Sequence, residues 1–456
     1  MKLKHILQFA FLFFIYSCQE KNSNAFDVSL NAKNELETIF ISEIITNKPI
    51  GEIHENKKPK TIQLDKPTVA LIHTKNNDKQ YLTILAPNKN LHISMSSESG
   101  LTTHNISDSL VNYLWKSNAK FIIENASFIN KTKNTDSIPV IFEVFRKERA
   151  NEISKFKDQF SQEVLDILYF QNDARVFAYL FFLGRVNKGL SPSDSYFDFI
   201  KQIPEASETL KSLPGIYLYK YEVDYLREHQ AIISVSDFLN YIEKKTTNKD
   251  LADFLKAYYL KNLIEIPSYW EKHEKLFNTL VLNDVLNSEK SNPYYYLIEQ
   301  PASAFYSSQN GEPAYLFEAE DAQGNHFSLE NLKGKVIFID TWATWCGPCI
   351  AHRPNVLEFA KKYKDNDEVE ILLVSVDSSK DSWLSFLEKE DENFGTNLFI
   401  ENGMRTEYGN RYNIKSIPRY ILIGKDGNII NSNINEPSLA VENEIERALA
   451  KTNTPL

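Results

Sequence analysis

The amino-acid sequence predicts a multidomain chain in which a small all-β domain and a helical domain precede an α/β domain at the C-terminal end. Three observations predict this fold class. Short strand-like runs separated by turn residues occupy residues 26–103, and helical patterns follow over residues 104–300. Further along, a short apolar run of β type, Val336–Asp340, is closely followed by a helix-forming segment, Pro348–Lys362.

Length and composition agree with several packed domains. A chain of 456 residues suggests about three domains, and the hydrophobic content of 42% is ample for packed cores. The formal net charge of −10 argues against nucleic acid as a partner, because domains that bind nucleic acid carry an excess of basic residues.

The N-terminus has the features of an export signal. Met1–His5 is basic, and Ile6–Tyr16 is an apolar run too short to span a bilayer as a stable helix. Ile15–Cys18 resembles a bacterial lipobox, because a small residue directly precedes the cysteine. We expect residues 1–17 to be a lipoprotein signal peptide, cleaved before Cys18 with lipid attached to that residue. In the alternative, the signal is an ordinary cleaved one and Cys18 is incidental.

This interpretation places the chain in the cell envelope. Several acyl chains on Cys18 would anchor it firmly to a membrane. Residues 18–25 form the expected tether, and no later segment reaches the roughly 18 apolar residues of a spanning helix. The predicted location is therefore the cell envelope, with the chain lipid-anchored to a membrane and facing the periplasm or the exterior.

Residues 26–103 predict a small β-sandwich-like domain. Runs of β-forming residues are separated by turns that contain Asn, Lys, Pro and Asp. The predicted strands are Thr38–Ile45, Lys60–Leu64, Val69–His73, Tyr81–Ala86 and Leu91–Met95. The sequence does not indicate what this domain does.

Residues 104–300 predict a helical domain. In Val140–Phe156 the apolar residues at 140, 141, 144, 145, 153 and 156 recur with a period close to 3.6. Val176–Leu183 is apolar all round, so we expect it to be the central helix of the domain, and Asp237–Glu243 and Leu251–Leu263 are further amphipathic candidates. We interpret most tyrosines of this region as core or interface residues, with a binding groove as the alternative.

The pair Cys346 and Cys349 indicates the chemistry. It places two thiols one helical turn apart at the predicted strand-to-helix junction. A thiol at a helix N-terminus faces unpaired backbone N–H groups and the positive end of the helix dipole, so its thiolate is favoured. We expect Cys346 to attack a partner disulfide and Cys349, one turn further in and more buried, to resolve the mixed disulfide. This step closes a redox-active Cys346–Cys349 disulfide.

A zinc site is the other common use of two cysteines at this spacing. Zinc needs four ligands, and no second pair of cysteines or histidines follows in the sequence. The third cysteine is Cys18, so we expect no structural disulfide in the mature chain. The sequence therefore predicts no metal site, and we expect no cofactor.

Four motifs follow one another in the last third of the chain, namely Lys333–Lys335, Trp342–Cys349, Val374–Asp377 and Ser416–Pro418. Together they resemble the thioredoxin superfamily, and more narrowly its periplasmic, membrane-tethered branch of the TlpA and ResA type. The resemblance implies a thioredoxin-like domain over residues 312–452, with a central mixed sheet flanked by helices. The β domain is similar in pattern and position to the small β-sandwich that precedes thioredoxin domains in lipoproteins of the Bacteroidetes type.

The resemblance also implies roles for single residues. Asp340 would be buried beside Cys349 and would take and return its proton, whereas the alternative is a solvated carboxylate at the strand end. Ile417–Pro418 would be a cis peptide bond, with the Ile417 backbone pairing with a substrate strand and Pro418 packing over the disulfide; the alternative is an ordinary turn proline. The residues that would shape the site around the thiols are Trp345, Gly347 and Pro348.

Two positions depart from the family pattern. His352 stands where this branch often has Glu, and it either tunes the pKa of the thiols or is an exposed helix histidine. Arg419 follows the proline where thioredoxins usually have Thr. It either adds positive charge to the substrate groove or is a solvated surface residue.

We therefore expect a membrane-anchored, extracytoplasmic thiol:disulfide oxidoreductase. Gly347-Pro348 between the cysteines matches thioredoxin, whose dithiol is strongly reducing, so a reductase is the first interpretation. The expected partners are disulfide-bearing proteins and a membrane electron donor of the DsbD or CcdA type; family analogy adds apocytochrome c, and so cytochrome c biogenesis. Two alternatives stay open. One is a disulfide oxidase or isomerase with the same residues, and the other is an envelope lipoprotein that binds a partner and carries an accessory redox domain.

Overall fold

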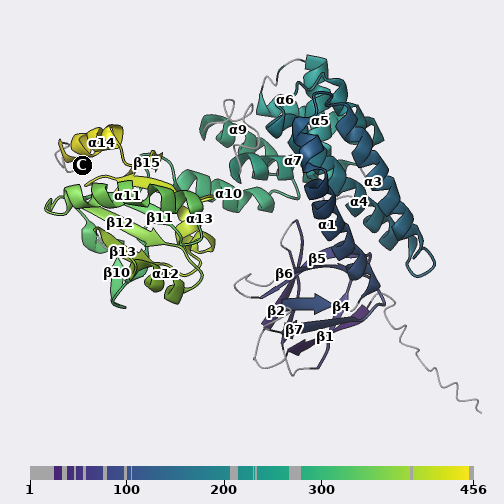
Figure 1. Cartoon of the computed structure of the whole chain (residues 1–456), viewed down its shortest axis with the longest axis horizontal. Coiled ribbons are helices and arrows are strands. Elements are labelled where there is room, and N and C mark those ends of the chain that lie inside the picture. The colour runs from purple at the N-terminus through teal and green to yellow at the C-terminus, as the bar shows by residue number, and fades with distance from the viewer. Residues whose placement is uncertain are drawn as a thin grey trace, which may run out of the picture. The chain divides into compact units, whose positions relative to one another are not determined.

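The computed structural model describes residues 25–32, 38–45, 48–54, 58–74, 80–96, 100–103, 105–205, 214–229, 231, 234–265, 279–390 and 394–450. The chain divides into two compact units, Met1–Tyr179 and Leu180–Leu456, and the division falls inside helix α4 (Gln162–Phe182) (Figure 1). The predicted signal peptide, Cys18 and most of the tether lie outside the described residues. Within those ranges, no helix has both the length and the apolar character needed to cross a membrane.

In the described part of the N-terminal unit, eight strands precede the helices. They are β1 (Ala25–Ala32), β2 (Thr38–Glu43), β3 (Pro49–His54), β4 (Lys60–Gln63), β5 (Thr68–Thr74), β6 (Gln80–Leu85), β7 (Leu91–Ser96) and β8 (Gly100–Thr103). They form two four-stranded sheets of order β4-β1-β7-β8 and β3-β2-β5-β6, in which only β1 and β7 pair in parallel. Buried side chains of both sheets, among them Val28, Ile93, Ile41 and Ile72, form one core. The predicted all-β region is confirmed.

The predicted strands match β2, β4, β5, β6 and β7 to within two residues. The sequence did not predict β1, β3 and β8. Two of these, β3 and β8, lie at sheet edges and bury few side chains, so their apolar pattern is weak.

A buried carboxylate joins the β region to the first helix, α1 (Ile106–Glu124). Asp108 is fully buried and accepts hydrogen bonds from the Thr83 hydroxyl, at 2.8 and 2.9 Å, and from the Ile84 N–H, at 3.1 Å. The Thr103 hydroxyl donates to the same carboxylate. The first turn of α1 is thereby bound to β6 and β8.

The described elements from Ile106 to Ser307 are all helical. They are α1, α2 (Ala126–Lys131), α3 (Ser137–Ser154), α4, the π-helical turn η1 (Leu183–Asn187), the 3-10 helix η2 (Ser195–Gln202), α5 (Gly215–His229), α6 (Val235–Lys245), α7 (Lys249–Glu265), α9 (Thr279–Glu289) and α10 (Tyr296–Ser307). The predicted segments Asp237–Glu243 and Leu251–Leu263 lie within α6 and α7. Tyr217, Tyr221 and Tyr225 of α5 are buried, which supports their interpretation as core residues.

The predicted apolar face of α3 is partly wrong. Val140 and Val144 are 62% and 55% exposed, whereas Ile138, Phe142 and Phe145 are buried. The segment from 138 to 145 is apolar at nearly every position, so its period did not specify which side faces the core.

The last third of the chain is built on one mixed seven-stranded sheet. Its strands are β9 (Glu318–Asp321), β10 (His326–Ser328), β11 (Val336–Trp342), β12 (Val369–Ser375), β13 (Thr396–Phe399), β14 (Arg419–Ile423) and β15 (Ile429–Ile434), in the order β10-β9-β13-β12-β11-β14-β15. Helices α11 (Gly347–Tyr363) and α14 (Leu439–Ala450) share an apolar cluster with one face, and α12 (Lys380–Leu387) and α13 (Glu407–Arg411) share another cluster with the sheet (Figure 1). A central mixed sheet flanked by helices is what the sequence predicted.

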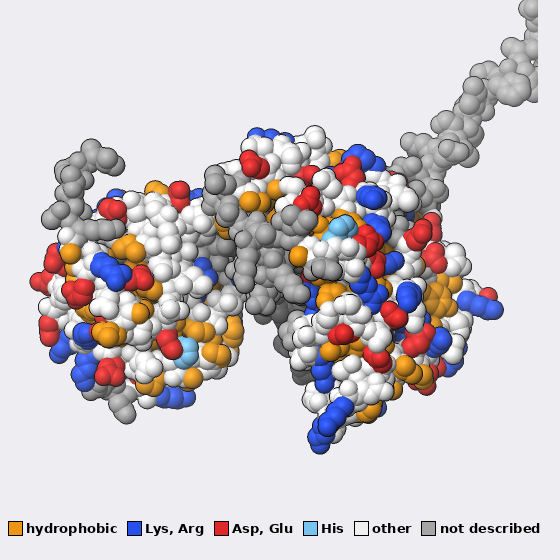
Figure 2. Space-filling model, turned by 90° about the horizontal axis from the view of Figure 1, so that it is seen from above, with side chains coloured by type: hydrophobic (Ala, Val, Ile, Leu, Met, Phe, Trp, Pro, Cys, Tyr) orange, Lys and Arg blue, Asp and Glu red, His pale blue; other side chains and the backbone are white. Residues whose placement is uncertain are grey.

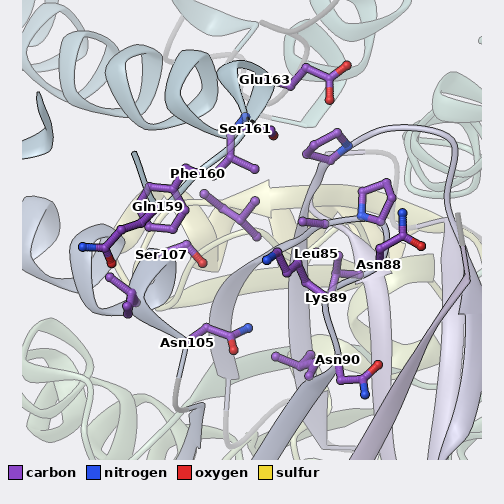
Figure 3. A pocket seen from close by; sticks show the side chains of 17 residues that line it. Leu85, Asn88, Lys89, Asn90, Asn105, Ser107, Gln159, Phe160, Ser161 and Glu163 are labelled. Carbon is purple, nitrogen blue, oxygen red and sulfur yellow. Dashed lines mark hydrogen bonds between the residues drawn. The ribbon is translucent and has the colours of Figure 1, made fainter. Parts of the chain in front are cut away.

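Acidic and basic side chains alternate over the visible surface in Figure 2 and do not segregate by sign. The N-terminal unit also contains a cavity of about 650 Å³ between the turn that joins β6 to β7 and the segments 105–107 and 159–164. Its wall combines apolar side chains such as Leu85 and Phe160 with the amides of Asn88, Asn105 and Gln159 (Figure 3).

Candidate active site

The strand that leads to the two cysteines lies inside the seven-stranded sheet. All seven residues of β11 are buried, and the strand pairs in parallel with β12 and antiparallel with β14. Helix α11 begins at Gly347, with Cys346 as its N-cap. The predicted strand-to-helix junction at Cys346 is therefore confirmed.

Cys346 and Cys349 form a disulfide bond, with their Cα atoms 5.2 Å apart. The backbone N–H of Cys349 donates to Sγ of Cys346 over 3.2 Å. After reduction, this N–H and the helix N-terminus favour a negative charge on Cys346. The expectation that Cys349 is the more buried of the two is wrong. Both residues are 4% exposed, because both pack into one apolar cluster with Trp342 and Ala343.

Three of the residues predicted to shape the site lie next to this disulfide in the chain and are exposed to solvent. Trp345 is 63% exposed, and Gly347 and Pro348 are also exposed. The Ile417–Pro418 peptide bond is cis, as expected, and Ile417 packs against the cluster that contains both cysteines. The surface next to the buried disulfide is therefore open to solvent at Trp345.

The loop before the disulfide is held by Asp377, whose role sequence reasoning missed. Asp377 is 2% exposed and follows the end of β12. Its carboxylate accepts hydrogen bonds from the Thr344 N–H at 3.0 Å, the Thr344 hydroxyl at 2.8 Å and the Ser375 hydroxyl at 2.8 Å. An acidic residue at the end of the strand parallel to β11 was the available signal.

We expect Asp377→Asn to destabilise the C-terminal domain by about 1–3 kcal/mol, because an amide cannot replace a buried carboxylate that accepts all of these bonds. Denaturant unfolding of the oxidised full-length chain measures this loss. Asp365→Asn is the matched control, since the side chain of Asp365 is 88% exposed, and it should change the midpoint little.

Asp340 is buried, so its interpretation as a solvated strand-end carboxylate is wrong. Its exposed fraction is 3%, and burial raises its pKa from 3.8 to about 7, against the opposing effect of the Arg353 guanidinium. Side chains alternate along a strand, so Asp340 lies on the same face of the sheet as Phe338. The centre of the Phe338 ring is 5.1 Å from the centre of the Phe359 ring on α11. Asp340 therefore lies beneath α11, the helix that carries Cys349.

Sequence reasoning also missed Arg353, one helical turn after Cys349. Its side chain is 4% exposed, and its Nε and Nη2 each donate to a carboxylate oxygen of Glu390 over 2.8 Å. The guanidinium carbon lies 4.0 Å from the centre of the Trp342 ring. The spacing of four residues from Cys349 was a signal for a shared helix face, but nothing in the sequence pointed to Glu390 as the partner.

The two residues that depart from the family pattern are each partly buried. His352 Nδ1 lies 3.2 Å from the Tyr420 hydroxyl and 3.1 Å from Oε2 of Glu436, and its side chain is 35% exposed. Arg419 donates from Nε to the Ser432 carbonyl over 2.7 Å, and burial lowers the pKa of its guanidinium. Arg419 is therefore not a solvated surface residue. Whether His352 and Arg419 tune the thiols or bind substrate stays a prediction.

Among the described residues, no three His, Cys, Asp or Glu side chains are grouped so that they could hold a metal ion. The candidate site therefore consists of the disulfide, the buried acid Asp340 and the groups that hold them in place.

Comparisons with known proteins agree with this site. A family model described as thioredoxin-like matches residues 334–429, which include Asp340, both cysteines and Pro418. The thiol-disulfide oxidoreductase ResA of Bacillus cereus is 33% identical over 128 residues, which are 28% of this chain and 71% of that protein. ResA of Bacillus subtilis is 30% identical over 124 residues, covering 27% of this chain and 66% of that protein.

Solved structures give matches of similar extent. The crystal structure of a putative thiol-disulfide oxidoreductase from Bacteroides vulgatus is 36% identical and matches 31% of this chain and 98% of that one, with a TM-score of 0.29. The C-terminal domain of a putative thiol-disulfide oxidoreductase from Bacteroides thetaiotaomicron is 26% identical, matches 31% and 97% of the two chains, and also has a TM-score of 0.29.

Proposed function

Since the chain belongs to the thioredoxin-like thiol–disulfide oxidoreductases, we propose that it acts as a reductase, which transfers electrons from Cys346 and Cys349 to disulfide bonds of protein substrates. One observation carries the proposal: the disulfide at the N-terminus of α11 has a buried acid of pKa about 7, Asp340, beneath its helix. Gly347 and Pro348 between the cysteines favour the reducing direction, because strongly reducing thioredoxin carries the same pair.

In the first step, the Cys346 thiolate attacks one sulfur of the substrate disulfide. The substrate S–S bond breaks and a mixed disulfide with Cys346 forms, while the other substrate sulfur leaves as a thiolate and takes a proton from solvent. Cys346 attacks first because it caps α11 and lies between the exposed residues Trp345 and Gly347.

In the second step, the Asp340 carboxylate takes the proton of the Cys349 thiol. The Cys349 thiolate attacks Sγ of Cys346, the Cys346–Cys349 bond forms, and the second substrate sulfur leaves with the electron pair of the broken mixed disulfide. The substrate gains two electrons and the protein dithiol becomes a disulfide. A dithiol donor must reduce it again, and we propose a membrane protein of the DsbD or CcdA type.

The shape of the site suits an extended substrate segment. Trp345 offers a large exposed ring next to Cys346, and Ile417, at the cis peptide bond, packs against the cluster that contains both cysteines. We propose that the Ile417 backbone pairs with the substrate chain, while Pro418 packs over the two sulfurs.

The reduction potential of the Cys346–Cys349 pair tests the direction of transfer. Equilibration of the full-length chain against a dithiol buffer should give a value near the thioredoxin figure of about −270 mV. A value near the DsbA figure of about −120 mV would make the chain an oxidase and overturn the proposal.

We also propose that Cys18 carries lipid and holds the chain in the cell envelope. The lipobox-like Ile15–Cys18 after a short apolar run supports this. Metabolic labelling with a fatty acid analogue should mark the full-length chain and leave Cys18→Ala unlabelled. Equal labelling of both chains would contradict a lipid at this position.

One observation favours the alternative of a partner-binding lipoprotein with an accessory redox domain. The cavity of about 650 Å³ in the N-terminal unit lies far in sequence from the cysteines and has amides and both charges, Lys89 and Glu163, in its wall (Figure 3). A double variant Cys346→Ser, Cys349→Ser that fully complemented a deletion of the gene would favour that alternative.

A further inference from the structure

We propose that Arg353, held in place by Glu390, is a positioning residue. It controls whether Asp340 is charged when Asp340 accepts the proton of Cys349 during disulfide exchange. The inference rests on the proposed role of Asp340 as proton acceptor. Neither Arg353 nor Glu390 belongs to the sequence motifs that indicate the redox site.

Arg353 and Asp340 lie at the same end of the packing between α11 and β11. Cys349 and Arg353 are one turn apart on α11, and both are buried, so they lie on the face of the helix that packs on the sheet. Phe338, two residues before Asp340, packs against Phe359 of the same helix. Because β11 and α11 run in opposite directions, Asp340 lies below the earlier turns of α11, where Cys349 and Arg353 are.

The guanidinium of Arg353 is held in place on several sides. Two hydrogen bonds of 2.8 Å join it to both oxygens of Glu390, and a third of 3.2 Å joins Nη2 to Asn397. The Trp342 ring covers one of its faces at 4.0 Å. Arg353 therefore holds a fixed positive charge in a region from which water is largely excluded, where charges act strongly on one another.

Within the described part of the chain, Arg353 and Asp340 each retain one buried polar atom without a hydrogen bond. Nη1 of Arg353 and Oδ1 of Asp340 are both buried, and neither has a hydrogen-bond partner among the described residues. In an ordinary surface ion pair, the N–H donors of the arginine would be satisfied by its own carboxylate partner. Here Glu390 binds Nε and Nη2 of the guanidinium, and Nη1 remains a buried donor without a partner in the described structure.

Besides Arg353 and its partner Glu390, the groups near Asp340 are two phenols, with Arg419 beside one of them, Tyr408, and the pair His352 and Glu436 beside the other, Tyr420. Tyr420 of β14 pairs in register with Asp340, and Tyr408 of α13 donates to or accepts from Thr341 at 2.6 Å. Burial raises the pKa of both phenols, and the charge of Asp340 adds to this. Arg419 acts on Tyr408, and Cys349 is the thiol that the acid serves. Arg353 is thus the charge that acts on Asp340 directly.

Two substitutions with opposite expected effects follow. Arg353→Met removes the positive charge, so Asp340 should hold its proton to higher pH. Glu390→Gln removes the negative charge that compensates Arg353, while Trp342 and Asn397 still hold the guanidinium, so Asp340 should lose its proton at lower pH. A purely structural ion pair predicts effects in the same direction, because either substitution breaks the same contact.

The experiment is a pH profile of single-turnover oxidation of the pre-reduced full-length chain by saturating oxidised glutathione, where resolution by Cys349 limits the rate. We expect an inflection near pH 7 that disappears in Asp340→Asn. Arg353→Met should move it up, and Glu390→Gln down, each by about one pH unit. Arg353→Lys, which keeps the charge, should stay nearer the parent than Arg353→Met.

A matched control comes from the same helix. Lys362 of α11 and Glu442 of α14 form an ion pair of 2.7 Å, and Lys362→Met and Glu442→Gln should leave the inflection in place. If the inflection vanishes in Asp340→Asn but moves the same way, or not at all, in the Arg353 and Glu390 variants, this inference is overturned and the role of Asp340 stands. If it persists in Asp340→Asn, the proposed role of Asp340 fails as well.

Discussion

Cys349→Ser should turn the chain into a trap that accumulates mixed disulfides with its substrates. Cys346 in this variant still caps α11 and keeps the helix N-terminus that favours its thiolate, so attack on a substrate disulfide proceeds. The serine hydroxyl cannot attack the mixed disulfide, so the second step stops. Turnover should fall to the background rate, and non-reducing electrophoresis should show adducts that a reductant removes.

Cys346→Ser is the matched control, because it keeps one thiol of the pair and changes only its position. It should lose turnover equally but form few adducts, since the remaining thiol lies one turn inside the helix. Adducts of equal yield in both variants would contradict the assignment of Cys346 as the attacking residue. Identification of the trapped proteins by mass spectrometry would also name the substrates.

Asp340→Asn should slow the resolution step by about 100-fold at pH 7, which is the low end of what a positioned general base contributes. The amide cannot accept the proton of Cys349. The defect should shrink above roughly pH 8.5, where an ordinary cysteine thiol ionises without help. The measurement is the rate at which a preformed mixed disulfide on Cys346 releases its second thiol. A loss that stays constant up to pH 9.5 would mean that Asp340 acts through structure and not through its proton.

The same substitution should stabilise the protein at alkaline pH. The pKa of Asp340 is about 7 in the folded chain and 3.8 without burial, so the folded state binds more protons between these values. The contribution of Asp340 to the stability of the parent therefore falls as pH rises from about 4 to 7 and is level above. At about 1.4 kcal/mol per pH unit the cost reaches about 4 kcal/mol above pH 7.

Denaturant unfolding of the oxidised chains from pH 4 to 9 tests this, because a disulfide keeps the cysteines from titrating. Asp340→Asn should be more stable than the parent at pH 8, and the difference should shrink toward pH 4. Equal stability of the two chains at pH 8 would contradict a buried carboxylate at this position. Asp365→Asn, at an exposed position, serves as the control.

Much of the candidate site could be predicted from the sequence, because its parts are local. Cys346 and Cys349 are three residues apart, and a continuous apolar run that forms the strand directly precedes them. The burial of Asp340 and the cis bond at Ile417–Pro418 also agree with the resemblance. The expectation that Cys349 is more buried than Cys346 also failed for a local reason. The position of a residue in a helix does not reveal how much of Cys346 the surrounding loop covers.

The groups that were missed join segments far apart in the chain. Glu390 lies 37 residues after Arg353, and Asp377 lies 33 residues after Thr344. Each of these residues is an ordinary charged or polar residue in its own segment. Only the parallel pairing of β11 with β12, and the packing of α11 on the sheet, bring the partners into contact.

The sequence alone determined the order of all-β, helical and α/β regions and the identity of the thiol pair, because periodicity and short motifs depend on neighbours within a few turns. The tertiary structure decided which face of α3 is buried and which residue compensates the positive charge of Arg353. It also decided how strongly Asp340 holds its proton. That last property depends on the exclusion of water and on charges brought close by folding, and neither is encoded at the position of the acid itself.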